Sequence, residues 1–121
     1  MNEFKLIIAG GRDFNDYGVL SREVFLLANV TYQAHTISVV SGMAPGADTL
    51  GHRFAKQHGL TVYEFPADWN RLGKRAGFMR NEDMGKFSDG LLAFWDGKSK
   101  GTAHMIQFMK SLGKPVHIVK Y

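Results

Sequence analysis

The 121-residue sequence contains no cysteine, and this absence excludes several kinds of protein. Disulfide-stapled folds, thiolate nucleophiles and zinc sites with cysteine ligands are all ruled out. Long apolar runs are also missing, and the short apolar stretch near the N-terminus does not fit a signal peptide. The simplest expectation is a cytoplasmic protein that has no contact with a membrane.

Several catalytic signatures are missing as well. No segment fits G-x-x-x-x-G-K-[ST], so an ordinary P-loop NTPase is excluded. Nothing fits the dinucleotide fingerprint G-x-G-x-x-G after the first apolar run, and no serine lies in a G-x-S-x-G elbow. The five histidines have no spacing typical of metal ligands, so we expect neither a metal nor a resident cofactor.

The charge of the chain favours an anionic partner. The formal net charge is +4, which suits ligands from nucleotides to nucleic acid. The basic residues are spread along the sequence rather than clustered. The length fits one domain over residues 1–121 that buries its own core.

Five short apolar runs predict strands, because each is rich in β-branched or aromatic residues and bounded by turn residues. They cover residues 4–10, 36–42, 61–67, 90–97 and 115–121. The first, second and fourth runs are almost continuously apolar. Strands of this kind are typically buried on both faces of a parallel sheet.

Helical periodicity lies between these runs. The first predicted helix has Asp16 as N-cap and an apolar face that includes Tyr17 and Leu27, and the next two cover residues 47–58 and roughly 75–87. The last begins at Thr102 and is closed by Gly113. Strands that alternate with helices predict an α/β fold. We expect a single Rossmann-like domain with a mainly parallel five-stranded sheet and helices on both faces.

Folds of this class bind ligands at the carboxyl ends of the strands, near the point where the strand order reverses. Four unusual loops fall at this edge of the predicted sheet. Their sequences are GGRDF, SGMAPGAD, ADWNRLGKRAG and WDGKSKGT. We therefore look for the functional site among these loops.

The loop WDGKSKGT has the composition of an anion site. Gly97 and Gly101 allow a tight turn and close approach of a ligand, and Ser99 and Thr102 offer hydroxyls. The helix that follows begins with unpaired amide groups and a partial positive charge. The alternative is a plain turn in which Thr102 caps the helix.

The loop after the second strand repeats this design. Ser41 and Gly42 end the strand, while Gly46 and Ala47 allow close approach of a ligand. Asp48 falls in the first helical turn, where it interacts favourably with the helix dipole. The same carboxylate is alternatively placed to hold a ribose hydroxyl or to orient a neighbouring loop.

The remaining two loops supply cations. Gly10 and Gly11 precede Arg12, which we predict as a bidentate phosphate partner with a solvated arginine as the alternative. In the third loop and the helix after it, cations are interleaved with aromatic side chains, namely Arg71, Lys74, Arg75 and Arg80 with Trp69 and Phe78. This mixture suits a base stacked beside a phosphate, or a solvated basic face.

Taken in order, the segments GGRDF, SGMAPGAD, ADW, GKRAGFMRNEDM and WDGKSKGT resemble the SLOG superfamily, in particular the small YspA-like proteins of bacteria and phages. The resemblance covers nearly the whole chain. It implies a Rossmann-like sheet and a nucleotide or nucleotide derivative as ligand, such as a nucleoside phosphate or an ADP-ribose-like molecule. It also implies a homo-oligomer, because such proteins commonly form dimers or larger assemblies.

The superfamily includes the Lonely Guy phosphoribohydrolases, and part of their motifs is present in this sequence. Arg80 matches their catalytic arginine, and Asn81 is the second residue of that pair. Gly101 and Thr102 match the phosphate-binding G-T of P-G-G-x-G-T-x-x-E. The resemblance therefore implies that these residues take part in a phosphate site.

The glutamate of that motif has no counterpart, because residues 103–105 are Ala, His and Met. A carboxylate stabilises the oxocarbenium-like transition state of N-glycosidic cleavage, so its loss should be costly. Asp13, Asp68 or Asp96 are alternatives from other loops, or these side chains cap helices and pair with arginines. We name Asp68 with Arg80 as candidate catalytic residues.

Three functions follow as hypotheses. The first is binding of a nucleotide derivative, with phosphate held by residues 46–47 and 101–102, cations from Arg12, Arg75 and Arg80, and a hydroxyl held by Asp48 or Asp96. The second is a phosphoribohydrolase that cleaves a nucleoside monophosphate. The third is a single-stranded nucleic-acid-binding module, by analogy with the Smf/DprA members of the superfamily.

Overall fold

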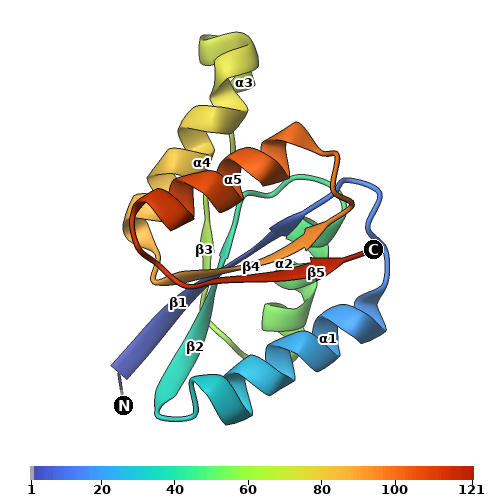
Figure 1. Ribbon diagram of the computed structural model, residues 1–121, viewed down its shortest axis with the longest axis vertical. Helices are drawn as coiled ribbons and strands as arrows, with labels where there is room; N and C mark the ends of the chain where they lie inside the picture. Colours follow the sequence, from blue (N-terminus) through green and yellow to red (C-terminus); the bar gives the residue numbers. More distant parts are fainter. Residues whose placement is uncertain (1) are drawn as a thin grey trace.

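The computed structural model describes residues 2–121 and contains one five-stranded sheet (Figure 1). The strand order is β3-β2-β1-β4-β5, and every neighbouring pair is parallel. The strands are β1 (Asn2–Gly10), β2 (His35–Ser41), β3 (Val62–Glu64), β4 (Gly90–Trp95) and β5 (Val116–Lys120). The predicted Rossmann-like α/β class is confirmed.

The helices cover both faces of this sheet. They are α1 (Tyr17–Leu26), the π-helical η1 (Leu27–Thr31), α2 (Ala47–Gln57), α3 (Trp69–Leu72), the 3-10 turn η2 (Gly73–Arg75), α4 (Ala76–Phe87) and α5 (Lys100–Ser111). Helices α1 and α2 lie on one side, and α4 and α5 lie on the other (Figure 1). None of the helices within residues 2–121 is both long and apolar enough to cross a bilayer.

The central strand β1 explains why its sequence is continuously apolar. Leu6 and Ile8 pack into the core under α1 and α2, whereas Ile7 and Ala9 pack into the core under α4 and α5. Successive side chains of a strand point to opposite faces, so a strand covered on both sides buries all of them. The main core of the protein is therefore two apolar layers separated by the sheet.

Local signals set several of the helix ends. Asp16 caps α1 by accepting a hydrogen bond of 3.1 Å from the amide of Val19, as predicted. The helical path then continues through the π turn η1, which begins at Leu27. Gly113 follows α5 with a φ of +70°, a conformation that favours glycine, so the predicted stop is confirmed.

The region between β3 and α4 differs from the prediction. The strand ends at Glu64 instead of continuing to residue 67, because Pro66 has no amide to donate to the sheet. A short helix and a 3-10 turn then precede α4, and Gly73 separates them with a φ of +60°. This segment projects beyond the edge of the sheet (Figure 1).

The strand order creates a crevice at the carboxyl edge. The chain moves outward from β1 through β2 to β3, and then returns to place β4 on the other side of β1. The connections after β1 and β4 therefore leave in opposite directions, which is the switch point where α/β proteins bind ligands.

Candidate functional site

A cleft of about 490 Å³ lies over the carboxyl ends of β1 and β4. Its walls come from the loops after β1, β2 and β4 and from the first turns of α4 and α5. It brings together eleven residues predicted for the site, namely Gly10, Gly11, Arg12, Asp13, Asp48, Arg80, Asn81, Asp96, Ser99, Gly101 and Thr102.

The two glycines after β1 are required by packing within the protein. The amide of Gly11 donates to Phe94 O at 3.0 Å and so extends the pairing with β4. A β-carbon at Gly10 would lie 2.3 Å from Phe94 O, and one at Gly11 would lie 1.8 Å from Tyr121 Oη. The chain leaves the sheet directly after this contact, which places the exposed Arg12 on the cleft.

The loop after β2 is tied to the loop after β1. The amide of Ala47 donates to Gly11 O at 3.2 Å, and a β-carbon at Gly46 would lie only 2.2 Å from the same oxygen. The amide expected to hold a phosphate is thus used inside the protein. Ala47 therefore joins the two loops instead of offering its amide to an anion, and the predicted anion contact at Gly46 stays a prediction.

Ser41 shapes this loop from behind the cleft. Its side chain is fully buried, and its Oγ donates to Asp48 O and accepts from the amide of Met43, both at 3.2 Å. Ser41 is therefore not a direct ligand contact, contrary to the prediction. Gly42 is required because a β-carbon there would lie 2.7 Å from Arg80 Nη1 and 2.8 Å from Asp48 Oδ2.

Asp48 is a buried carboxyl group on the wall of the cleft. Only 4% of the residue is exposed, and Oδ2 accepts from the amide of Ala44 at 3.4 Å. Burial raises the pKa of Asp48 to about 6, against the opposing effect of the positive charge on Arg80. The group therefore changes charge close to neutral pH and offers an acceptor for a hydroxyl.

Arg80 is held from two sides. Its Nη1 donates to Gly42 O, and its Nε donates to Asn81 Oδ1 at 3.0 Å. Burial lowers the pKa of Arg80, while the charge of Asp48 raises it. These contacts fix the guanidinium on the boundary between the loop after β2 and helix α4.

Asn81 links helix α4 to the start of α5. The residue is 6% exposed, and its Nδ2 donates to Gly101 O at 3.2 Å and lies 3.3 Å from His104 Nδ1. A buried amide with these partners sets the position of the first turn of α5. Asn81 therefore positions the predicted anion site as well as lining the cleft.

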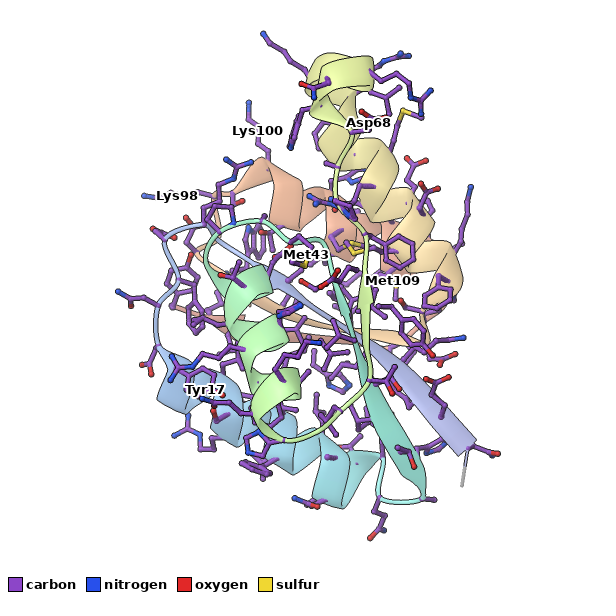
Figure 2. The ribbon with its side chains drawn as sticks, turned by 180° about the vertical axis from the view of Figure 1, so that it is seen from behind. Tyr17, Met43, Asp68, Lys98, Lys100 and Met109 are labelled. Atoms are coloured by element: carbon purple, nitrogen blue, oxygen red, sulfur yellow. The ribbon has the colours of Figure 1, made fainter. Side chains whose placement is uncertain are left out.

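The turn before α5 is built around Asp96. Its Oδ1 accepts from the amides of Ser99 and Lys98, both at 2.8 Å, and these bonds lower the pKa of the Asp96 carboxyl. Gly97 completes the turn with a φ of +85°, in agreement with the tight turn predicted there, and it does not line the cleft. Lys98 and Lys100 project outward from this segment (Figure 2).

The first turn of α5 presents free donors to the cleft. Among the hydrogen bonds of residues 2–121, the amides of Lys100, Gly101 and Thr102 have no acceptor. A β-carbon at Gly101 would meet no atom within 4 Å, and its φ is not positive. Neither packing nor backbone conformation requires glycine there, so its absent side chain keeps the space beside these amides open.

Arg75 and Asp68 are two further predicted residues that do not line the cleft. Arg75 is exposed at the end of η2, and Lys74, the residue before it, lines the cleft instead. Asp68 caps α3 by accepting from the amide of Arg71 at 3.2 Å and pairs with Arg71 Nε at 2.9 Å, which lowers its pKa. It lies on the projecting segment (Figure 2) and does not line the cleft, so the structure favours the alternative of a helix cap paired with an arginine.

The sequence interpretation missed Tyr121, which contacts the cleft residue Asp13. The hydroxyl of Tyr121 donates to Asp13, and its ring packs at 5.0 Å against Phe14. Burial and this hydrogen bond raise the pKa of Tyr121 to about 12. The partners are 108 residues apart, so no local pattern could have revealed the pair.

Asp13 and Asp96, two of the carboxylates named as alternatives to the missing glutamate after Thr102, line the cleft. Glu82 lies near this position, but its Oε2 is 3.6 Å from His104 Nε2 and it does not line the cleft. Within the part of the chain that the structure describes, no group of three or more His, Asp or Glu residues could hold a metal ion.

Residues 4–72, more than half of the chain, match the family described as YspA, cpYpsA-related SLOG. The protein belongs to this SLOG family. It is 40% identical over 84 residues to the Gene 61 protein of Mycobacterium phage D29, a match that covers 64% of this chain and 67% of that protein. The predicted SLOG membership is confirmed, and it fits a nucleotide- or nucleic-acid-binding role.

Solved structures share the SLOG fold. DNA processing protein A (DprA) of Streptococcus pneumoniae aligns with a TM-score of 0.71 at 19% identity, over 97% of this chain and 50% of that one. The protein TM1055 aligns with a TM-score of 0.65 at 21% identity, over 96% and 72%. DprA of Helicobacter pylori aligns with a TM-score of 0.62 at 18% identity, over 95% and 64%. At these identities the likeness shows the fold alone, and this chain spans half of the pneumococcal protein.

Proposed function

We propose that this SLOG protein binds a nucleotide or nucleotide derivative in the cleft, with a phosphate group at the first turn of α5. The observation that carries the proposal is the set of unpaired amides at residues 100–102 beside the open space at Gly101. Amides at a helix N-terminus, together with the helix dipole, favour an anion.

Cations that line the cleft also favour a negatively charged ligand. Arg12 and Lys74 are exposed side chains that line the cleft, and Arg80 is fixed nearby by Gly42 and Asn81. Guanidinium groups form strong, directional hydrogen bonds with phosphate oxygens. The cleft therefore offers both main-chain and side-chain donors to a phosphate.

Other features of the cleft suit the rest of a nucleotide. The carboxyl of Asp48 is an acceptor for a sugar hydroxyl, and Trp69 and Phe78 offer exposed aromatic surface. The volume of about 490 Å³ falls within the range of roughly 300–1,000 Å³ that is usual for small-molecule sites.

Thermal denaturation with AMP, ADP, ADP-ribose and NAD tests the proposal. At least one of them should raise the melting temperature in proportion to the logarithm of its concentration. Arg12→Ala should reduce the shift, whereas Arg22→Ala should not, because Arg22 lies on α1 and only approaches Glu23. No shift with any of the four at millimolar concentration would reject the proposal.

We propose binding without glycosidic cleavage. Asp13 Oδ1 accepts from the Tyr121 hydroxyl, Asp96 Oδ1 accepts from main-chain amides, and Asp68 lies outside the cleft. Chromatography after incubation with AMP should show intact nucleotide. Release of adenine would establish a phosphoribohydrolase instead.

Single-stranded nucleic acid is a second candidate, favoured by the exposed aromatic surface of Trp69 and Phe78 beside Lys74. The Helicobacter pylori neighbour is described as binding single-stranded DNA. A mobility shift with single-stranded DNA that weakens steeply with salt would support this candidate. Absence of a shift at low salt would remove it.

A further inference from the structure

A second hollow of about 310 Å³ adjoins the cleft at the carboxyl ends of β2 and β3. We call it the side compartment. Arg12, Ala44, Trp69 and Arg80 line both spaces, so the two are joined along this border. A ligand that entered both would lie across the carboxyl edge of the sheet, from β4 over β1 toward β3.

The side compartment differs from the cleft in its chemistry. The walls that it does not share come from Gly42, Met43, Pro45, Pro66 and Ala67, none of which carries a charge. The apolar rings of the two prolines and the polarizable thioether of Met43 suit contact with an aromatic ring. Its cations lie only on the shared border, so a second phosphate inside it would be less well satisfied than an uncharged ring.

Met43, on this wall, has an unusual backbone conformation. Its φ is +63°, in the left-handed region that side chains rarely adopt, and its amide donates to Ser41 Oγ at 3.2 Å. Strained residues of this kind cluster at ligand-binding positions. Figure 2 shows Met43 beside the start of α2, where its partly exposed side chain lines the side compartment.

We propose that the side compartment holds the planar base of the nucleotide while the phosphate lies at α5. Arg12 and Arg80, on the border, then contact the part of the ligand between base and phosphate. This inference rests on the proposed function and narrows its ligand class. The protein should prefer nucleoside phosphates with an intact base over base-free sugar phosphates.

Methyl NMR of the wild-type protein with labelled methionine locates the adenine ring of bound AMP. Met43 lines the side compartment, whereas Met105 lines the cleft. AMP should produce a ring-current shift at the Met43 methyl, and ribose 5-phosphate should produce none. A ring-current shift at Met105 instead of Met43 would overturn the inference.

A variant that fills the side compartment tests the placement of the base through the affinity for AMP and for ribose 5-phosphate. Ala67→Trp adds bulk only to the side compartment, and Ala34→Trp is the control because Ala34 is exposed before β2, at the opposite edge of the sheet. Ala67→Trp should weaken AMP binding at least tenfold and leave ribose 5-phosphate binding unchanged. Unchanged AMP affinity, or an equal loss for both probes in a folded variant, would overturn the inference.

The two proposals fail in different ways. Wild-type protein that binds ribose 5-phosphate as tightly as AMP would overturn the placement of the base and keep the phosphate site. Wild-type protein that binds neither probe would overturn both.

Discussion

Arg80 and Asp48 flank Gly42 at the border between the cleft and the side compartment. A β-carbon on Gly42 would lie 2.7 Å from Arg80 Nη1 and 2.8 Å from Asp48 Oδ2, so the absent side chain is what allows both charged groups to approach. The two residues come from different helices, and each lines the cleft. The site therefore joins a buried carboxyl with a cation next to it.

Asp48 should make the stability of the protein depend on pH. Its pKa is about 6 in the folded protein and about 3.8 when exposed, so the folded state binds more protons between these values. Stability should fall as the pH rises from 4 to 7, by on the order of 2–3 kcal/mol. Asp48→Asn should lack this loss.

Melting temperatures of both proteins between pH 4 and 8 check this expectation. The melting temperature of Asp48→Asn, relative to that of the wild type, should increase as the pH rises. A constant difference at every pH would show that burial does not raise the pKa of this carboxyl.

Gly101→Ala should separate binding from folding. The new methyl group would meet no atom within 4 Å, and alanine stabilises a helix by about 0.5–1 kcal/mol relative to glycine. The melting temperature should therefore stay the same or rise slightly, while the affinity for AMP falls because the methyl group occupies the space beside the free amides.

The matched control is Gly18→Ala in the first turn of α1, where the nearest atom to a β-carbon is 3.6 Å away. Both variants should melt at or above the wild-type temperature, and only Gly101→Ala should bind AMP more weakly. Equal AMP affinity in the two variants would argue against a ligand at α5.

Tyr121→Phe should loosen the loop that carries Arg12. The change removes the hydrogen bond to Asp13 but keeps the ring against Phe14. A lost hydrogen bond of this kind costs about 0.5–1.5 kcal/mol. Calorimetric titration should also show weaker AMP binding, because Asp13 and Arg12 line the cleft.

Tyr17→Phe is the control for this prediction, since the Tyr17 hydroxyl donates to Gln57 away from the cleft. It should lower the melting temperature by a similar amount and leave AMP affinity unchanged. If both tyrosine variants bind AMP like the wild type, Tyr121 does not position the loop.

Asn81→Ala should destabilise the junction of α4 and α5. Asn81 is buried and donates to Gly101 O, and the loss of such a hydrogen bond costs about 0.5–1.5 kcal/mol. Chemical denaturation should show this loss, whereas Asn29→Ala on the exposed surface of η1 should change stability by less than about 0.5 kcal/mol. Similar denaturation midpoints for the two variants would contradict the role assigned to Asn81.

Much of the fold was predictable because its signals are local. The apolar runs of β1 and β4 are continuous since both faces of these strands are buried, and Asp16 and Gly113 mark helix ends. The location of the cleft followed from the same pattern, because parallel strands bring their carboxyl ends to one edge.

The details of the site depend on contacts that no local pattern encodes. Lys74 faces the cleft and Arg75 does not, and this choice depends on the orientation of an unpredicted 3-10 turn. The amide of Ala47 donates its hydrogen bond to Gly11 O, which lies far away in the sequence. Composition identified the right loops but could not show which of their donors remain free.

Amide NMR spectra recorded during titration with AMP test the central claim most directly. We expect the amide resonances of Gly101 and Thr102 to move downfield in a saturable manner, because their free N–H groups donate to the phosphate. The resonance of Ala47, whose amide already has an acceptor, should move much less. Saturable binding of AMP that leaves the resonances of Gly101 and Thr102 unchanged would contradict a phosphate site at the start of α5.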